Sequence, residues 1–212
     1  MWELVKAGGW LMLPLVLCSI FTVAITIERM IRLKKSIILP KALLLNQTQN
    51  AHAVMQQLQQ DETLKGSTLG RIFTAGYQSK NQNEQYARAQ MEVTASQEIG
   101  YLEKNINFLG TLSAVAPLLG LLGTVLGIIE SFLVIDLGTN SNPTLMIPGI
   151  SKALITTAAG MFIAIPALFA YRYFQRLVQE YVAELEQQST LFHAALFYQN
   201  STVEEQDLRK AG

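Results

Sequence analysis

The sequence has little of what cysteine, metal or phosphate chemistry needs. Cys18 is the only cysteine among 212 residues, which excludes an intramolecular disulfide and a cysteine-based zinc site. His52 and His193 lie far apart, and neither has a metal-ligating residue at helical spacing. The Gly-x-x-x-x-Gly-Lys phosphate loop is missing as well. We therefore predict no catalytic residue, no metal site and no cofactor, in a protein that is not an enzyme.

Charged residues are also scarce. They make up 15% of the chain, against roughly 25% in an average globular protein, whereas hydrophobic residues make up 50%. The 16 basic and 16 acidic residues cancel, so no net field attracts nucleic acid. This composition predicts a protein that lies in a lipid bilayer and does not bind nucleic acid.

Three apolar segments are long enough to cross a membrane, which needs about 20 residues of helix. The first, GWLMLPLVLCSIFTVAITI, has no charged residue, and the third, ALITTAAGMFIAIPALFAY, has none either. The second contains a single acid, Glu130. A cleaved signal peptide is the alternative for the first segment, but its apolar stretch is too long and the basic residues follow it.

Basic residues set the predicted orientation. Arg29, Arg32, Lys34 and Lys35 follow the first span, Lys104 precedes the second, and Arg172 and Arg176 follow the third. The positive-inside rule places these flanks in the cytoplasm. The expected segments are a periplasmic N-terminus (1–8), a first span (9–28), a cytoplasmic helical domain (29–106), a second span (107–135), a periplasmic turn (136–152), a third span (153–172) and a cytoplasmic helix and tail (173–212).

The predicted fold class is an all-α membrane protein in which the second and third spans extend into long cytoplasmic helices. Residues 40–60 and 84–105 are rich in helix-forming residues, and Gly66, Ser67 and Gly70 interrupt the helical pattern between them. The segment from Glu84 to Lys104 has no proline, so it can continue directly into the second span.

Small residues form a stripe on each of the last two spans. The stripe contains Gly120, Gly123 and Gly127 in the second span, and Gly160 and Ala164 in the third. At about 100° per residue, such positions fall on one face, where another helix can approach closely. Two such faces indicate either tight helix packing or a lined passage.

Thr124, Thr156 and Thr157 place hydroxyl groups near these faces at mid-membrane depth. Each hydroxyl can bond a carbonyl of the preceding turn in its own helix. The alternative is that the hydroxyls line a proton pathway and solvate water or the carboxyl group of a partner. No Asp or Glu lies at the centre of a span, so proton transport would need a carboxylate from a partner.

Glu130 and Lys152 sit toward the outer ends of their spans. We expect both side chains to reach the interface by snorkelling. The alternative is a salt bridge between the two helices at the mouth of a pathway.

Two motifs resemble the MotA/TolQ/ExbB proton-channel family. They are APLLGLLGTVLGII, which begins at Ala116, and PGISKALITTAAGMFIAIPA, which begins at Pro148. The apolar N-terminus that ends in Ile27-Glu28-Arg29 is similar too, and the chain as a whole is more similar to ExbB than to TolQ. One departure is Lys152, which stands where many ExbB and TolQ proteins have glutamate.

The resemblance implies an ExbB-like subunit of the bacterial inner membrane, which forms a homopentameric ring around a single-span, ExbD-like partner. Such a complex would use proton-motive force to energise a TonB-like protein that acts on outer-membrane transport. By the same resemblance, Thr124 and Thr157 match pore-facing threonines, and the partner's aspartate carries the proton. The alternatives are a TolQ-like subunit of the Tol-Pal envelope-integrity system and a structural membrane scaffold without an ion pathway.

Overall fold

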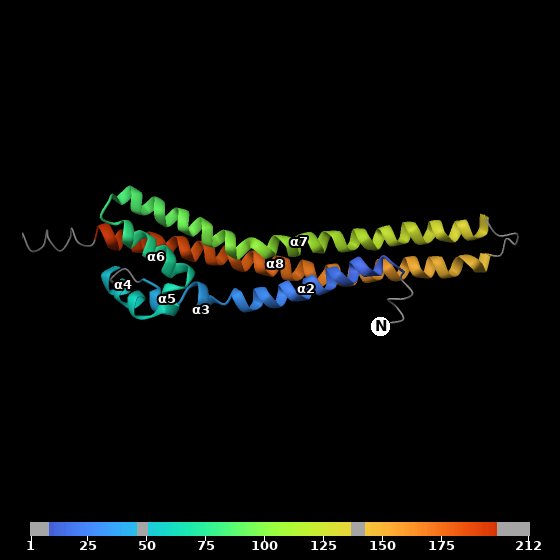
Figure 1. Cartoon of the computed structure of the whole chain (residues 1–212), viewed down its shortest axis with the longest axis horizontal. Coiled ribbons are helices and arrows are strands. Elements are labelled where there is room, and N and C mark those ends of the chain that lie inside the picture. Colours follow the sequence, from blue (N-terminus) through green and yellow to red (C-terminus); the bar gives the residue numbers. More distant parts are fainter. Residues whose placement is uncertain (1–8, 46–50, 137–142, 199–212) are drawn as a thin grey trace, which may run out of the picture. The chain divides into compact units, whose positions relative to one another are not determined.

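The computed structural model describes residues 9–45, 51–136 and 143–198, and every regular element within these ranges is a helix. The elements are α2 (Met12–Arg32), α3 (Lys35–Ile38), η1 (Lys41–Leu43), α4 (Ala51–Gln60), α5 (Glu62–Lys65), α6 (Thr68–Ser79), α7 (Glu84–Asp136), η2 (Pro143–Met146) and α8 (Ile147–Phe197). Figure 1 shows the two long helices, α7 and α8, as the main elements of the chain. The predicted all-α membrane fold is confirmed.

Three helices are long and apolar enough to cross a membrane, and they lie within Met12–Arg32, Glu84–Leu133 and Thr144–Phe197. The expected extensions are confirmed, because α7 and α8 are continuous helices of 53 and 51 residues. Both continue through an internal proline, Pro117 in α7 and Pro166 in α8. Which residues face which side of the membrane stays a prediction.

The chain divides into two compact units. The first, the membrane unit, contains residues up to Met30 and Asn105–Gln175, and the second, the helical cap, contains Ile31–Lys104 and residues from Arg176 onward. In the membrane unit, Met12 and Leu15 of α2 pack against Ala116 of α7 and Ala164 of α8. Small residues on the long helices therefore receive larger side chains from α2.

The predicted turn at 136–152 is too long at its C-terminal end. Residues 143–146 form η2, and α8 begins at Ile147, so 147–152 are helical. Pro148 is compatible with this helix because it lies in the first turn, where backbone N–H groups have no helical acceptor. Asp136 is the last residue of α7, and residues 137–142 of the predicted turn lie outside the described ranges. The predicted N-terminus (1–8) and residues 199–212 of the predicted tail also lie outside them.

In the helical cap, short helices pack against parts of α7 and α8 through a core of large apolar side chains. Phe73 of α6 stacks on Phe192 of α8 with ring centroids 4.1 Å apart, and neither ring is exposed. Tyr181 donates to the Leu33 carbonyl at 2.9 Å, and the Leu45 amide donates to Gln188 at 2.7 Å. These two bonds fix the chain after α2 against α8.

The helix break predicted at Gly66, Ser67 and Gly70 lies at the first two of these residues, between α5 and α6, and not at Gly70. Ser67 is the N-cap of α6 and accepts a bond from the Gly70 amide at 3.1 Å, so Gly70 lies inside the helix. A Cβ at Gly70 would collide with the Leu64 carbonyl. The glycine is thus required by close packing against α5 and not by a turn.

Candidate functional site

The glycines of the stripe lie where α7 and α8 contact each other in the membrane unit. A Cβ on Gly160 would lie 2.6 Å from the Ala116 carbonyl oxygen and 3.1 Å from Gly120 Cα. A Cβ on Gly127 would lie 2.8 Å from Ala153 Cβ. Such separations are shorter than van der Waals contact, so a larger residue would force the two backbones apart. Ala164, the fifth stripe residue, is 7% exposed and packs in the cluster with α2.

The three threonine hydroxyls have different acceptors. Thr124 donates to the Leu121 carbonyl at 2.6 Å, and Thr156 to the Ala153 carbonyl at 2.8 Å, each within its own helix. Thr157 instead donates across the hairpin, to the Gly120 carbonyl of α7 at 2.8 Å. The local bonding that we considered is therefore present at two of the three positions, and the third hydroxyl joins α7 to α8.

The accessibility of the threonines also differs. Thr156 is 1% exposed, and its side chain lies against Gly123, where a Cβ would collide with it. Thr124 and Thr157 are half-buried, so another molecule can reach them. Hydroxyl oxygens keep acceptor capacity while they donate, so both can still accept a hydrogen bond. That these residues line a pathway stays a prediction.

Glu130 and Lys152 form an ion pair between α7 and α8. Lys152 Nζ lies 2.7 Å and 3.1 Å from the two carboxylate oxygens of Glu130. The salt bridge that we gave as the alternative is therefore present between the two helices, and its place at the mouth of a pathway stays a prediction. Gly9, whose φ is +73°, lies directly over the Lys152 side chain. A Cβ there would meet the flexible end of Lys152, so the residues before α2 lie over the lysine of the pair.

Ser131, which the sequence does not predict as a site residue, makes a further contact between α7 and the segment before α8. It is 2% exposed and donates to the Gly127 carbonyl at 2.8 Å, with the Met146 carbonyl at 3.3 Å. Its hydroxyl therefore links the end of α7 to the segment that enters α8. A small polar residue four positions after Gly127 is the only sequence signal for this link.

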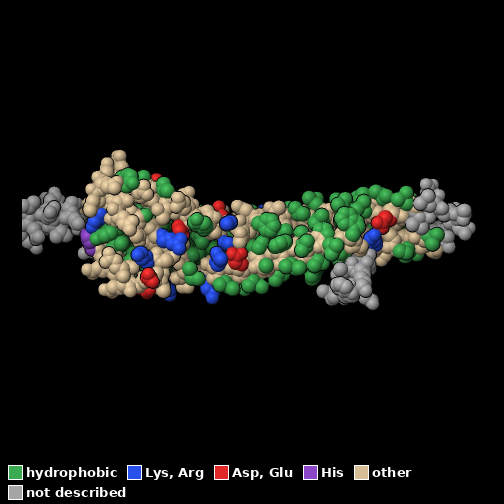
Figure 2. Space-filling view, in the orientation of Figure 1, with side chains coloured by type: hydrophobic (Ala, Val, Ile, Leu, Met, Phe, Trp, Pro, Cys, Tyr) green, Lys and Arg blue, Asp and Glu red, His purple; other side chains and the backbone are tan. Residues whose placement is uncertain are grey.

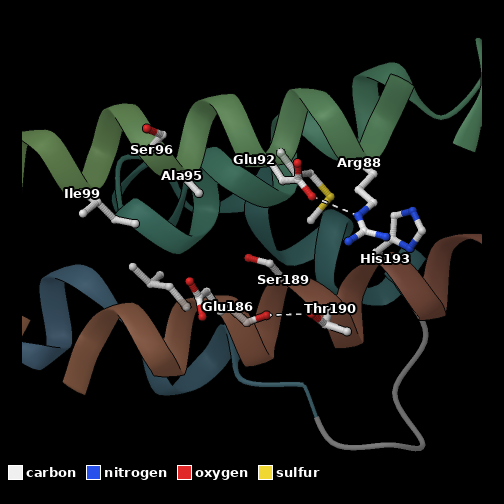
Figure 3. A pocket seen from close by; sticks show the side chains of 11 residues that line it. Arg88, Glu92, Ala95, Ser96, Ile99, Glu186, Ser189, Thr190 and His193 are labelled. Atoms are coloured by element: carbon white, nitrogen blue, oxygen red, sulfur yellow. Dashed lines mark hydrogen bonds and ion pairs between the residues drawn. The ribbon is translucent and has the colours of Figure 1, made fainter. Parts of the chain in front are cut away.

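The helical cap has a groove of about 610 Å³ between α7 and α8 (Figure 3). Arg88 and Glu92 of α7 form an ion pair at 3.0 Å on its edge. Ser189 and His193 of α8 also line it, but neither Ser189 Oγ nor His193 Nε2 has a hydrogen-bond partner in the part of the chain that the structure describes. Serine and histidine are thus neighbours here without the nucleophile–base contact that acyl transfer needs.

Comparison with known proteins decides the family. The profile described as "MotA/TolQ/ExbB proton channel family" matches residues 65–187, which include both long apolar stretches of α7 and α8. A putative biopolymer transport protein ExbB-like 1 from Synechocystis is 31% identical over 206 residues, covering 91% of this chain and 78% of the relative. The chain belongs to the MotA/TolQ/ExbB proton channel family.

Within the MotA/TolQ/ExbB family, relatives of two kinds are similar to this chain. The Tol-Pal system protein TolQ of Haemophilus influenzae is 36% identical over 111 residues, which cover 50% of this chain and 49% of TolQ. The biopolymer transport protein ExbB of Salmonella typhimurium is 40% identical over 85 residues, which cover 40% of this chain and 35% of ExbB. The identities do not separate an ExbB-like from a TolQ-like role.

Proposed function

We propose that this family member is the ExbB-like subunit of an inner-membrane transducer that uses proton-motive force, with an ExbD-like partner, to energise TonB-dependent transport. The observation that carries the proposal is the α7–α8 hairpin. It presents the hydroxyls of Thr124 and Thr157 at half-buried positions, while 107–129 and 153–171 contain no Asp or Glu. A hairpin of this kind can solvate a titrating carboxylate but cannot supply one.

The energetic reason for hydroxyls is the cost of a charge in hydrocarbon. An ionised carboxylate from a partner helix would cost several kcal/mol in the bilayer without polar neighbours. Thr124 and Thr157 can rotate their hydroxyl hydrogens from the Leu121 and Gly120 carbonyls toward such a carboxylate. When the acid is protonated, the same oxygens accept its hydrogen. A neutral hydroxyl thus stabilises both states without fixing the charge, as proton transfer requires.

In this proposal Thr156 has a packing role and Thr157 faces the partner. Copies of the chain would form a ring, a homopentamer by the family resemblance, around the single span of an ExbD-like protein, and a TonB-like protein would receive the work. The basic residues that follow α2, among them Lys34 and Lys35, support an inner-membrane orientation with the helical cap in the cytoplasm and the N-terminus outside.

The proposal is tested by proton flux into liposomes that contain this chain and its ExbD-like partner. We expect flux with both proteins present, and a return to the background of empty liposomes when the partner is omitted. An Asp→Asn change in the partner's span should have the same effect, with the complex still isolated intact. Flux that persists without that aspartate would contradict the proposal, and so would a correctly assembled complex without flux, as a structural scaffold predicts.

A TolQ-like role is the second candidate, and the 36% identity to the Haemophilus TolQ favours it. It shares the proposed proton chemistry and differs in the partner that receives the work. Deletion of the gene separates the two roles. Loss of iron–siderophore uptake with an intact envelope supports the ExbB-like role, whereas leakage of periplasmic proteins with normal uptake supports the TolQ-like role.

A further inference from the structure

The helical cap contains a second cavity, of about 330 Å³, which opens to the surface and is bordered by α4, α5, α6 and the residues that follow α6. Its polar lining can supply several nitrogen donors. Two lysines and three side-chain amides contribute, namely Lys65, Lys80, Gln59, Gln78 and Asn81. The remaining lining is largely apolar and includes Met55 and Leu58 of α4. The cavity therefore combines hydrogen-bond donors with an apolar wall.

The charge of this cavity is not compensated by a carboxylate. Some basic side chains elsewhere in the cap pair with acids, as in Lys35–Glu184 at 2.6 Å and Arg71–Glu98 at 2.8 Å. Neither Lys65 nor Lys80 has such a partner among residues 9–45, 51–136 and 143–198, and no described lining residue is acidic. Two positive charges thus meet at one cavity, which favours an anionic ligand.

One of these lysines is held in place by an aromatic ring. Lys80 Nζ lies 4.0 Å from the centroid of the Tyr77 ring, a cation–π distance. Tyr77 in turn packs edge-to-face on His52, with ring centroids 5.7 Å apart, and its hydroxyl lies 3.4 Å from His52 Nδ1. The ring that positions the ammonium group is therefore itself fixed by α4.

We propose that this cavity binds the phosphate group of a phosphate monoester. Separate ammonium and amide donors around a cavity suit a tetrahedral group with several acceptor oxygens, whereas a planar carboxylate is matched best by the fork of an arginine. The volume of 330 Å³ is near the lower end of small-molecule sites, about 300–1,000 Å³, and exceeds what a free phosphate fills. The organic part of the ligand would lie against Met55, Leu58 and the Tyr77 ring.

The binding does not depend on the proton-channel function and can be measured on the purified full-length chain in detergent. Adenosine 5′-monophosphate is the soluble probe, with adenosine as its phosphate-free control, and isothermal titration calorimetry reports binding. Lipid nanodiscs with phosphatidic acid, against phosphatidylcholine alone, test whether the monoester comes from a lipid headgroup.

We expect the nucleotide to bind and adenosine not to bind. Lys65→Gln and Lys80→Gln should each weaken binding about tenfold, since each removes one charged hydrogen-bond donor. Lys41→Gln, which removes an exposed lysine of the cap that does not line the cavity, is the matched control and should bind like the wild type. Binding of phosphatidic acid alone, lost in the same two variants, would support the site and identify the lipid as its source.

Three results would overturn the proposal. They are no binding of either monoester, equal binding of adenosine and its monophosphate, and an equal loss of binding in Lys41→Gln. Both lysines are exposed or half-buried, so the variants should fold, and circular dichroism checks that they do. A failure here would leave the proton-flux proposal unaffected, because the two experiments measure different sites.

Discussion

The membrane unit and the helical cap use hydrophobic residues in opposite ways. In the membrane unit α7 and α8 touch each other through glycine, alanine and threonine, while many large side chains point outward, with Phe162 79% and Phe169 75% exposed. In the cap the large side chains, such as Phe73 and Phe192, are fully buried. Figure 2 shows the difference as hydrophobic side chains that cover the surface around the spans and more polar and charged side chains on the cap.

The contrast follows from the solvent of each unit. In water, burial of apolar area is the main driving force, so the cap places its aromatic rings inside. In lipid the surroundings are as apolar as leucine, so helices associate by close backbone packing and interhelical hydrogen bonds. A substitution of a large buried residue should therefore matter most in the cap, and a substitution that enlarges a small residue should matter most in the membrane unit.

The largest effect is expected for Phe192→Ala. Phe192 is fully buried and stacked on Phe73, so its removal should destabilise the cap by about 3–5 kcal/mol. Hydrogen–deuterium exchange should show faster exchange in α6, with the amides of 112–130 unchanged. Tyr86→Ala, at a 43% exposed position of the cap, is the control and should change little. Equal loss of protection in both units would contradict the expectation that a large buried side chain matters most in the cap.

Gly160→Ala should destabilise the membrane unit by about 1–3 kcal/mol through overpacking. The added methyl group would lie 2.6 Å from the Ala116 carbonyl oxygen. Gly100→Ala is the matched control, because nothing lies within 4 Å of its new methyl group and the helix should gain about 0.5–1 kcal/mol. Unfolding by sodium dodecyl sulfate in mixed micelles measures both variants. If both substitutions lower, or both raise, the free energy of unfolding, close packing at Gly160 is not the cause of the effect.

A smaller effect is expected for the ion pair. Glu130→Gln should cost at most about 1 kcal/mol, because the Glu130 side chain is 51% exposed and solvent screens the interaction. The double variant Glu130→Lys with Lys152→Glu, in which the two charges are exchanged, restores the attraction. It should be nearly as stable as the wild type in the same micelle titration. A double variant less stable than both single charge reversals would show that something other than mutual attraction holds the two side chains.

The smallest effect concerns the start of α5. The Thr63 hydroxyl, and then backbone amides, donate to the Asp61 carboxylate and hold its pKa below the ordinary value. Because the pKa is lower in the folded state, the ionised Asp61 carboxylate stabilises the fold fully above its pKa in the unfolded chain, about 3.9. This stabilisation disappears as the pH falls through the pKa of the folded state. Exchange protection of α5 relative to Asp61→Asn, which keeps an N-cap acceptor without the charge, should thus be greater at pH 6 than at pH 3. An unchanged difference would exclude this charge effect.

Much of the architecture could be predicted from the pattern of residues. Length and hydropathy locate the apolar segments, and the absence of proline between Glu84 and Lys104 predicts that α7 is continuous. The glycine spacing predicts a smooth face because helical periodicity is a local property. The boundary of the turn was not predictable in this way, since Pro148 suits both a turn and a helix start.

The bonding of the hydroxyls could not be predicted from local pattern. Thr156 and Thr157 are adjacent, yet one bonds its own helix and the other bonds Gly120 of α7. Their difference depends on how α8 is rotated against α7, which involves residues 37 positions apart. The pairing of Glu130 with Lys152 depends on the same register, and so does the cover that Gly9 provides.

The most direct test of the proposed role of the hairpin is proton flux through the reconstituted complex of Thr157→Val, compared with Thr157→Ser. Valine preserves the shape of threonine and removes the hydroxyl, whereas serine keeps the hydroxyl. Both complexes should assemble with the partner in the same ratio as the wild type. We predict that the valine variant conducts no protons above background and that the serine variant conducts near the wild-type rate. Wild-type flux through the assembled valine variant would contradict the proposed role of the hairpin.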